Sequence, residues 1–186
     1  MRFVELALPG VYQVEFEELA DCRGFFGRVW CAREFGARGL MTEAVQASLA
    51  HNAVNGTLRG MHFQAAPKRE ARLVRCVSGS AFMAVVDLRP GQESFLRHVT
   101  VVVSALNRHA IYVPAGRAMG YQTLEDRTEV LYFMNEYHDP ACSRGFRWND
   151  PVFGIRWPEA DRIILDRDRD YSDFDAGVVS GFAGYP

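Results

Sequence analysis

The chain of 186 residues is 48% hydrophobic, which is enough for a sizeable core, and we predict a single domain over residues 1–186. Its formal net charge of -2 gives no basic field for binding nucleic acid or an anionic membrane. No apolar run approaches the about 18 residues of a membrane-spanning helix, and the N-terminal MRFVELALPG lacks a signal-peptide pattern. The four scattered cysteines form no C-x-x-C pair, which favours reduced thiols and a cytoplasmic location.

Strand patterns dominate the chain. In VYQVEFEE (11–18), Tyr12, Val14 and Phe16 alternate with polar residues, which is the period of a half-buried strand. REFGARGL (33–40) is typical of one short helix, and EADRIILDRDRDYSDF (159–174) of a helical or irregular tail. The other predicted strands are TLRGMHFQ (57–64), LVRCV (73–77), FMAVVDL (82–88), VTVVV (99–103), AIYVP (110–114) and EVLYFM (129–134), and they are separated by predicted turns at VNGT, SGS, RPGQ, PAGRAMG, EDRT and HDP. Many short strands with little helix indicate an antiparallel sandwich or barrel, whose mouth is a natural ligand pocket.

The strand at 57–64 is unusual for a buried segment, because it contains Arg59 and, three positions later, His62. Alternation places Gly60, His62 and Gln64 on one face, where Gly60 either leaves room for a ligand or marks a bulge. A lone histidine in a strand is more often structural than catalytic. None of the five histidines forms an H-x-H or H-x-x-x-H pair, so we do not expect a bound metal. We also expect no other cofactor.

Other residues also have both a structural and a chemical interpretation. Tyr132 in EVLYFM is either a core aromatic residue or a hydroxyl with a functional partner. The run DRDRD (166–170) is typical of a solvated tail. Arg59 and Arg72 lie in or beside apolar runs, where burial of a guanidinium without a counter-ion is costly. An anionic ligand such as a diphosphate would offset that cost.

With these residues, the chain resembles the dTDP-4-dehydrorhamnose 3,5-epimerase family. The resemblance runs through DCRGFFGRVW (21–30), TLRGMHFQ (57–64), ARLVRCVSGSAFMAVVDLRPG (71–91), YVPAGRAMGYQTLEDRTEVLYFMNEYHDP (112–140), RGFRWNDPVFGIRWP (144–158) and LDRDRDYSDF (165–174). It implies an all-β fold, the double-stranded β-helix or cupin-type jelly roll, with short peripheral helices. It also implies a homodimer that works without metal on a nucleotide-diphosphate sugar.

The resemblance implies an epimerase of a 4-keto-6-deoxy hexose that inverts C3, C5 or both. A base removes the acidic proton beside the ketone, and an acid returns a proton to the opposite face of the sugar. His62 matches the base and Tyr132 the acid. Asp168 best matches the aspartate that orients the histidine, although Asp166 and Asp170 lie close by in the sequence. Positive charge beside the developing enolate is also required.

Further matches imply a substrate-binding set, which consists of Arg23, Arg28, Gln46, Ser48, Arg59, Met119, His138, Ser143 and Arg167. Within this set, Arg23 and Arg59 match arginines that hold the substrate, mainly through its phosphates. Gln46 matches a residue of the nucleotide pocket. Arg72 stands where the family has a catalytic lysine, and it keeps the positive charge that can stabilise an enolate.

Several positions depart from the family pattern. Met119 replaces an active-site histidine, and its thioether cannot donate a hydrogen bond to the substrate. The other departures are Arg28 and Ser143 for glutamates, Ala47-Ser48 for Asp-Asn, and His138, beside Tyr137, for an aromatic residue that stacks on thymine. The pocket rim is therefore more positive. This predicts either a nucleotide other than thymidine diphosphate or a bulkier or more anionic sugar.

Three alternatives to the epimerase remain open. A nucleotide-sugar 3,4-ketoisomerase would move the ketone instead of inverting a centre. A catalytically impaired homologue would bind nucleotide sugars without turnover, because of the changes at Arg72 and Met119. A metal-dependent cupin oxygenase fits the residues least well.

Overall fold

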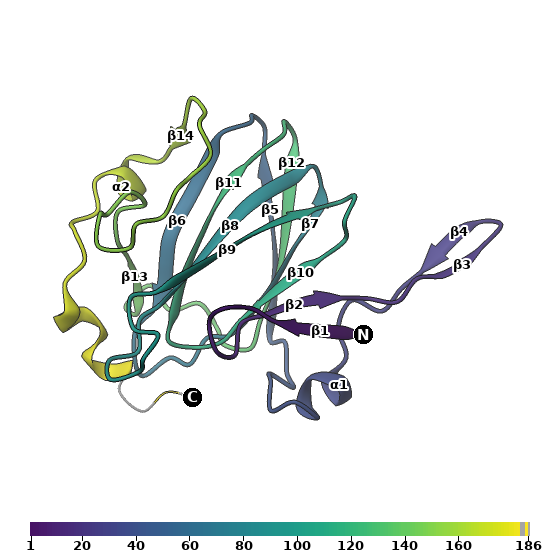
Figure 1. Cartoon of the computed structure of the whole chain (residues 1–186), viewed down its shortest axis with the longest axis horizontal. Coiled ribbons are helices and arrows are strands. Elements are labelled where there is room, and N and C mark those ends of the chain that lie inside the picture. The colour runs from purple at the N-terminus through teal and green to yellow at the C-terminus, as the bar shows by residue number, and fades with distance from the viewer. Residues whose placement is uncertain (183–184, 186) are drawn as a thin grey trace.

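In the computed structural model, which describes residues 1–182 and 185, two sheets face each other (Figure 1). The first has the order β1-β2-β10-β7-β12-β5, formed by β1 (Arg2–Glu5), β2 (Tyr12–Glu15), β10 (Ala110–Val113), β7 (Arg72–Ser78), β12 (Thr128–Met134) and β5 (Gln46–Asn52). The second has the order β13-β6-β11-β8-β9, formed by β13 (Ser143–Gly145), β6 (Thr57–Gln64), β11 (Arg117–Thr123), β8 (Ser80–Asp87) and β9 (His98–Ser104). The neighbouring strands named here are antiparallel, and β14 (Ile163–Ile164) adds to β6 in parallel. The helical segments are α1 (Ala32–Gly36), α2 (Asp166–Arg169) and the 3-10 helix η1 (Ala176–Phe182).

The seven strands predicted by alternation or by apolar runs are confirmed, although β2 ends at Glu15. The helix predicted at 33–40 is confirmed as the shorter α1, and the tail at 159–174 contains β14 and α2. The prediction that PAGRAMG (114–120) forms a turn is wrong for its second half, because β11 begins at Arg117. Every residue of β11 is buried, so the strand carries no polar and apolar alternation that would reveal it.

Apolar side chains from both sheets fill the space between them. Val74 and Ile111 of the first sheet share one buried cluster with Met83 and Val85 of the second. Burial of such side chains is the main source of stability in an all-β sandwich, at about 25 cal/mol per Å² of apolar area removed from water. Two members of this cluster, Met119 and Tyr121, also line the cavity described below.

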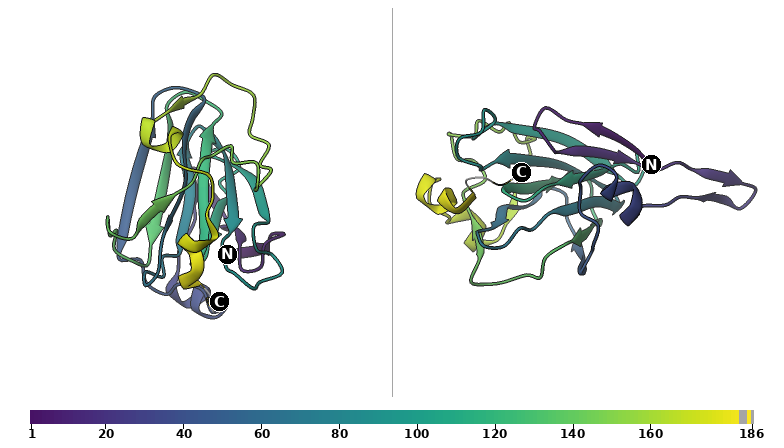
Figure 2. Two further views of the ribbon diagram at one scale, coloured as in Figure 1. Left: turned by 90° about the vertical axis from the view of Figure 1, so that its left-hand side faces the viewer. Right: turned by 90° about the horizontal axis from the view of Figure 1, so that it is seen from below.

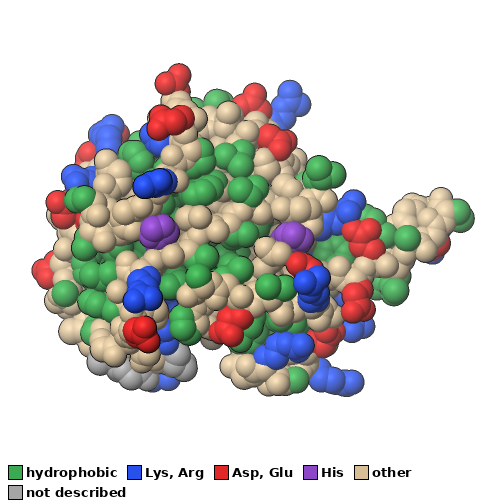
Figure 3. Space-filling view, viewed as in Figure 1, with side chains coloured by type: hydrophobic (Ala, Val, Ile, Leu, Met, Phe, Trp, Pro, Cys, Tyr) green, Lys and Arg blue, Asp and Glu red, His purple; other side chains and the backbone are tan. Residues whose placement is uncertain are grey.

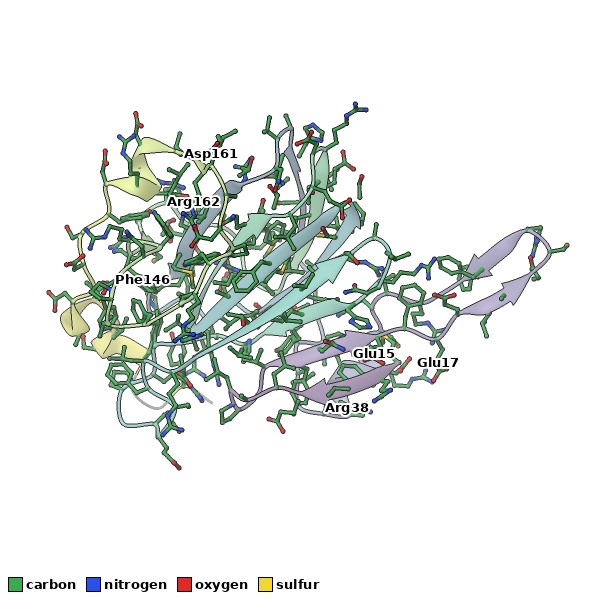
Figure 4. All side chains as sticks on the ribbon, turned by 45° about the horizontal axis from the view of Figure 1, so that its top comes forward. Glu15, Glu17, Arg38, Phe146, Asp161 and Arg162 are labelled. Carbon is green, nitrogen blue, oxygen red and sulfur yellow. The ribbon has the colours of Figure 1, made fainter. Side chains whose placement is uncertain are left out.

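A C-terminal segment, residues 144–182, covers the outer face of the second sheet (Figure 2). Leu58 and Phe63 of β6 belong to a buried cluster with Phe146, Phe153 and Phe182 of this segment, and Figure 4 labels Phe146 within it. The rings of Phe146 and Phe153 stack with centroids 4.3 Å apart, and those of Phe63 and Phe182 meet edge to face at 5.7 Å. This packing holds the segment that contains α2 alongside β6.

A bulge interrupts the pairing of β6 with β11. Met119 pairs with His62 and Tyr121 with Arg59, so two steps along β11 oppose three along β6. Gly60 lies at this point with φ of +127°, and a Cβ placed there would lie 2.5 Å from the Cα of Gly120. Gly60 therefore marks a bulge that lets the backbones approach closely, and it does not leave room for a ligand. As a result, Arg59 and His62 line the same side of β6 despite their odd spacing.

A hairpin of β3 (Leu19–Asp21) and β4 (Gly24–Phe26) extends away from the two sheets (Figures 1 and 2). Its large apolar side chains are open to solvent, with Leu19 66%, Phe25 45% and Phe26 71% exposed. In Figure 3 the same projection shows hydrophobic side chains on the face turned to the viewer. Among the residues that the structure describes, no helix is long and apolar enough to span a membrane.

Candidate active site

A cavity of about 780 Å³ is lined by strands of both sheets. Ten of the thirteen predicted site residues line it: Ser48, Arg59, His62, Arg72, Met119, Tyr132, His138, Ser143, Arg167 and Asp168. They come from β5, β7 and β12 of the first sheet, from β6, β11 and β13 of the second, from α2, and from the loop after β12. Their convergence from positions far apart in the chain is what the sequence interpretation required.

The other three predicted residues lie outside the cavity of this chain. Arg23 is on the extended hairpin, where its guanidinium pairs with Asp21 at 2.6 Å. Arg28 lies 3.4 Å from Glu34 of α1. Gln46, at the start of β5, accepts a hydrogen bond of 2.5 Å from the backbone N–H of His138, so it acts on the cavity wall indirectly. That these three residues contact the substrate stays a prediction.

Asp168 is the carboxylate that the structure brings to His62. Its Oδ1 lies 2.9 Å from His62 Nε2, and its Oδ2 accepts a hydrogen bond of 3.1 Å from the backbone N–H of Gly60. The side chain of Asp168 is only 2% exposed, whereas Asp166 and Asp170 are exposed and pair with Arg169. The single turn of α2 therefore turns one aspartate of the DRDRD run inward and leaves its two neighbours in solvent.

The environment of Asp168 keeps it ionised. Burial alone raises the pKa of its carboxyl, but hydrogen bonds from His62, Gly60 and Arg167 together outweigh burial and hold that pKa below its usual value. A carboxylate next to Nε2 fixes the tautomer in which Nε2–H donates to Asp168. Nδ1 of His62 is then the ring nitrogen that can accept a proton.

Tyr132 reaches the same cavity from the opposite sheet. Burial is the main cause that raises the pKa of its phenol well above the usual value, and the neighbouring Tyr121 raises it further. The positive charges of Arg72 and Arg59 counteract this rise only in part. The phenol therefore holds its proton at neutral pH and can act as a donor. His62 and Tyr132 are not directed into separate cavities, so a base and an acid can act on one ring held between the sheets.

Three arginines line the cavity, each with a different set of partners. Arg59 Nε donates to Asn52 Oδ1 at 2.9 Å, and its Nη2 lies 3.4 Å from a backbone carbonyl. Arg72 Nε is paired with Glu70. Arg167 Nε donates to Asp168 Oδ1 at 3.1 Å, so this guanidinium lies against the His62–Asp168 pair. The cavity is consequently suited to a ligand with negative charge.

Met119 provides an apolar part of the wall beside the base. It is buried and opposes His62 across the β6–β11 pairing. Because its thioether donates no hydrogen bond, this position can shape the sugar pocket but cannot hold a hydroxyl by donation. Among the described residues, no three His, Cys, Asp or Glu side chains come together as a metal site.

Two polar residues near the site were not identified from the sequence. Tyr121, on β11, lines the cavity and donates to Asn52 Oδ1 at 3.1 Å. Its position two residues after Met119 would have placed it on the same strand face, but the turn predicted for PAGRAMG concealed that relation. Glu70 was not identified either. Its carboxylate lies two residues before Arg72, at the start of an apolar run, and this spacing is a signal of a paired charge.

Comparison with known proteins finds relatives of this chain both in sequence and in structure. The family profile described as dTDP-4-dehydrorhamnose 3,5-epimerase matches residues 5–176. A dTDP-4-dehydrorhamnose 3,5-epimerase of Sinorhizobium fredii is 33% identical over 165 residues, which cover 89% of this chain and 85% of the relative. The crystal structure of dTDP-4-dehydrorhamnose 3,5-epimerase from Bacillus anthracis, with TDP and PPi bound, superposes with a TM-score of 0.89 at 31% identity, covering 93% of this chain and 99% of that chain.

A second solved structure is similar in fold and differs in reaction. ChmJ, a 3'-monoepimerase from Streptomyces bikiniensis in complex with dTDP-quinovose, gives a TM-score of 0.85 at 27% identity, covering 93% of this chain and 87% of that chain. The topology and these similarities confirm the predicted all-β fold, a cupin-type jelly roll with short peripheral helices.

Proposed function

Because this chain belongs to the dTDP-4-dehydrorhamnose 3,5-epimerase family, we propose that it is an isomerase that inverts C3, C5 or both of a nucleotide-diphosphate-linked 4-keto-6-deoxy hexose. The observation that carries the proposal is that His62, paired with Asp168, and Tyr132 come from different sheets and line one cavity. The reaction we propose needs neither a metal nor another cofactor, because a ketone already makes the neighbouring C–H bonds acidic.

In the proposed mechanism, Nδ1 of His62 takes the proton from the carbon beside the ketone, and the electron pair of the C–H bond moves into an enolate. Asp168 stabilises the imidazolium that forms. Tyr132 then transfers its phenolic proton to the opposite face of the same carbon, and the ketone is restored. One C–H bond breaks and one forms, and nothing is oxidised. His62 is left as an imidazolium and Tyr132 as a phenolate, and His62 releases its proton to solvent while Tyr132 takes one up before the next turnover. Arg72 lies near Tyr132 and can donate to the enolate oxygen.

The test is deuterium incorporation from solvent. The purified protein is incubated in D₂O with dTDP-4-keto-6-deoxyglucose, and exchange at C3 and C5 is followed by NMR, with His62→Asn as the inactive control. Deuterium with inverted configuration at one carbon identifies a monoepimerase, and deuterium with inversion at both carbons identifies a 3,5-epimerase. Movement of the carbonyl carbon to C3 would instead establish the ketoisomerase. Absence of exchange with a panel of 4-keto nucleotide sugars would contradict the proposal.

We propose that the nucleotide end of the substrate lies against Ser48, His138 and Ser143, on the side of the cavity formed by β5 and β13. None of these three side chains is a carboxylate, so this wall adds no counter-charge to Arg59. Calorimetric titration with TDP, UDP, GDP and CDP tests which base is accepted. Equal affinity for all four would show that this wall does not select the base.

We further propose that the protein is a homodimer in the cytoplasm, with residues 1–186 forming one domain. The support for the dimer is the extended hairpin, whose exposed Leu19, Phe25 and Phe26 need a partner surface. In a dimer, Arg23 of one chain could reach the substrate of the other. Light scattering tests this, and Phe26→Asp is expected to give a monomer; a wild-type monomer would contradict it. The four cysteines are free thiols, which suits a reducing compartment.

A further inference from the structure

The three arginines of the cavity differ in how much of their charge is available to a ligand. Arg59 is exposed and bonded to neutral groups, the amide oxygen of Asn52 and the carbonyl of His51. Within residues 1–182 and 185, no carboxylate lies within ion-pair distance of it. Arg167 is paired with Asp168, and Arg72 is paired with Glu70. Among these three arginines, Arg59 is therefore the one whose positive charge is not compensated by a carboxylate of the described residues.

Glu70 is held in place through both carboxylate oxygens. Oε1 accepts from Arg72 Nε, and Oε2 accepts a hydrogen bond of 2.6 Å from Gln64 Nε2. Gln64 is itself fixed, because it donates to the carbonyl of Tyr137 at 3.1 Å and accepts from the N–H of Asp139 at 2.8 Å. The side chain of Glu70 is 7% exposed. A buried carboxylate held this firmly fixes the orientation of the guanidinium attached to it.

Arg72 is oriented between the base and the acid. On the first sheet it pairs with Met134 and Val74 pairs with Tyr132, so Arg72 and Tyr132 are diagonal neighbours on one face. Nη1 of Arg72 points to the backbone carbonyl of His62, 3.5 Å away. With Nε committed to Glu70, the outer N–H groups of the fork remain for an oxygen of the ligand.

We propose that Glu70 is a positioning residue that assigns Arg72 to the sugar oxygen and leaves the diphosphate to Arg59. This inference rests on the proposed function. Glu70 does so in two ways: it fixes the plane of the guanidinium beside Tyr132, and it cancels most of its charge. Two free cations in the cavity would let the diphosphate bind Arg72 as well, which would draw the sugar away from His62 and Tyr132.

The test uses Glu70→Gln, which keeps the size of the side chain and removes its charge. Its single amide oxygen cannot accept from both Gln64 and Arg72, so the guanidinium loses its fixed partner or Gln64 does. Binding of dTDP alone, measured by calorimetry, is expected to become about threefold tighter, because the charge of Arg72 is no longer compensated. Exchange at the sugar carbon is expected to fall about tenfold in kcat, because the guanidinium is no longer held beside the enolate. In an Arg72→Met background, Glu70→Gln is expected to cause no further fall in kcat.

Glu136→Gln is the matched control, because Glu136 forms an ion pair with Lys68 and is not among the residues that line the cavity. It removes one negative charge from the same region and is expected to leave kcat and dTDP affinity unchanged. The inference is overturned if Glu70→Gln weakens dTDP binding, leaves kcat unchanged, or reduces kcat equally in the Arg72→Met background. If instead the wild type catalyses no exchange, the proposed function fails, while the dTDP titration still reports on the Glu70–Arg72 pair.

Discussion

Replacement of Asp168 by asparagine is the most direct probe of the proposed base. The substitution keeps the shape of the side chain and removes its charge. It also gives the buried site an NH₂ group that must face one of two donors, the N–H of Gly60 or Nε2–H of His62. In the first case a buried N–H loses its acceptor, and in the second the imidazole is free to adopt the other tautomer. Either outcome weakens the base.

The expected loss of activity follows from the hydrogen bonds to Asp168. A hydrogen bond to a charged group contributes about 1.5–3 kcal/mol, and the bond to His62 strengthens when the imidazole becomes positive. We therefore expect Asp168→Asn to lose about 3 kcal/mol of transition-state stabilisation. At about 1.36 kcal/mol for each factor of ten, this is a fall of about 150-fold in kcat. The unfolding free energy is expected to fall by about 1–3 kcal/mol, the cost of one unsatisfied buried donor.

The assay is deuterium incorporation at the sugar carbon, with thermal unfolding measured in parallel. Asp170→Asn is the matched control, because Asp170 is two residues away, exposed, and paired with Arg169 instead of His62. It is expected to exchange deuterium at the wild-type rate. Asp168→Asn with wild-type activity, or Asp170→Asn with an equal loss, would refute the assignment of Asp168.

The same variant makes a prediction about pH. The pKa of Asp168 in the folded protein lies below its unfolded value, through the hydrogen bonds that overcome burial. Its stabilising contribution is therefore complete above the unfolded value, about 3.9, and is lost as the pH falls through the folded pKa. The difference in unfolding free energy between wild type and Asp168→Asn should stay constant from pH 7 to about pH 5 and should narrow as the pH is lowered from about 5 towards about 3. A difference that stays constant over this range would contradict the ionised state.

Three other predictions concern separate features. Tyr132→Phe is expected to reduce formation of the inverted product about 100-fold or more, while His62 still exchanges the proton that it removes. NMR should then show deuterium with retained configuration. An equal loss of deuterium exchange and of inversion would argue against separate roles for His62 and Tyr132. Gly60→Ala is expected to destabilise the protein by about 3 kcal/mol or more, because of the positive φ and the contact with Gly120, and a denaturant midpoint like that of the wild type would contradict the bulge. Burial raises the pKa of the Cys76 thiol to about 12, so a thiol reagent at pH 8 should label exposed Cys22 and leave Cys76 unlabelled; early labelling of Cys76 in the native protein would contradict its burial.

The strands were predictable wherever alternation or an apolar run was present. The sequence 129–134, for example, identified β12 and with it Tyr132. β11 was not predictable in this way, since a strand buried on both faces between β6 and β8 shows no period of two and begins directly after a glycine turn.

The candidate site was predictable to a similar degree. Resemblance indicated an aspartate within DRDRD, but only the turn of α2 shows that Asp168 is the one directed inward. The bulge at Gly60 and the pairing of Arg72 with Glu70 depend on contacts between particular atoms, and no periodicity reports such contacts. The position of Arg23 outside the cavity could not be foreseen either, because it depends on where the hairpin extends.

Because the segment that covers β6 also contains Asp168, it determines when the active site can assemble during synthesis of the chain. His62 and the carboxylate that orients it are 106 residues apart, and the latter arrives on a turn held down by aromatic rings from the last part of the chain. During synthesis on the ribosome, every strand of the two sheets except β14 can emerge while His62 still lacks its partner Asp168. A chain that ends before Asp168 would therefore lack the carboxylate that orients His62, and the proposed base would be complete only after α2 has been synthesised.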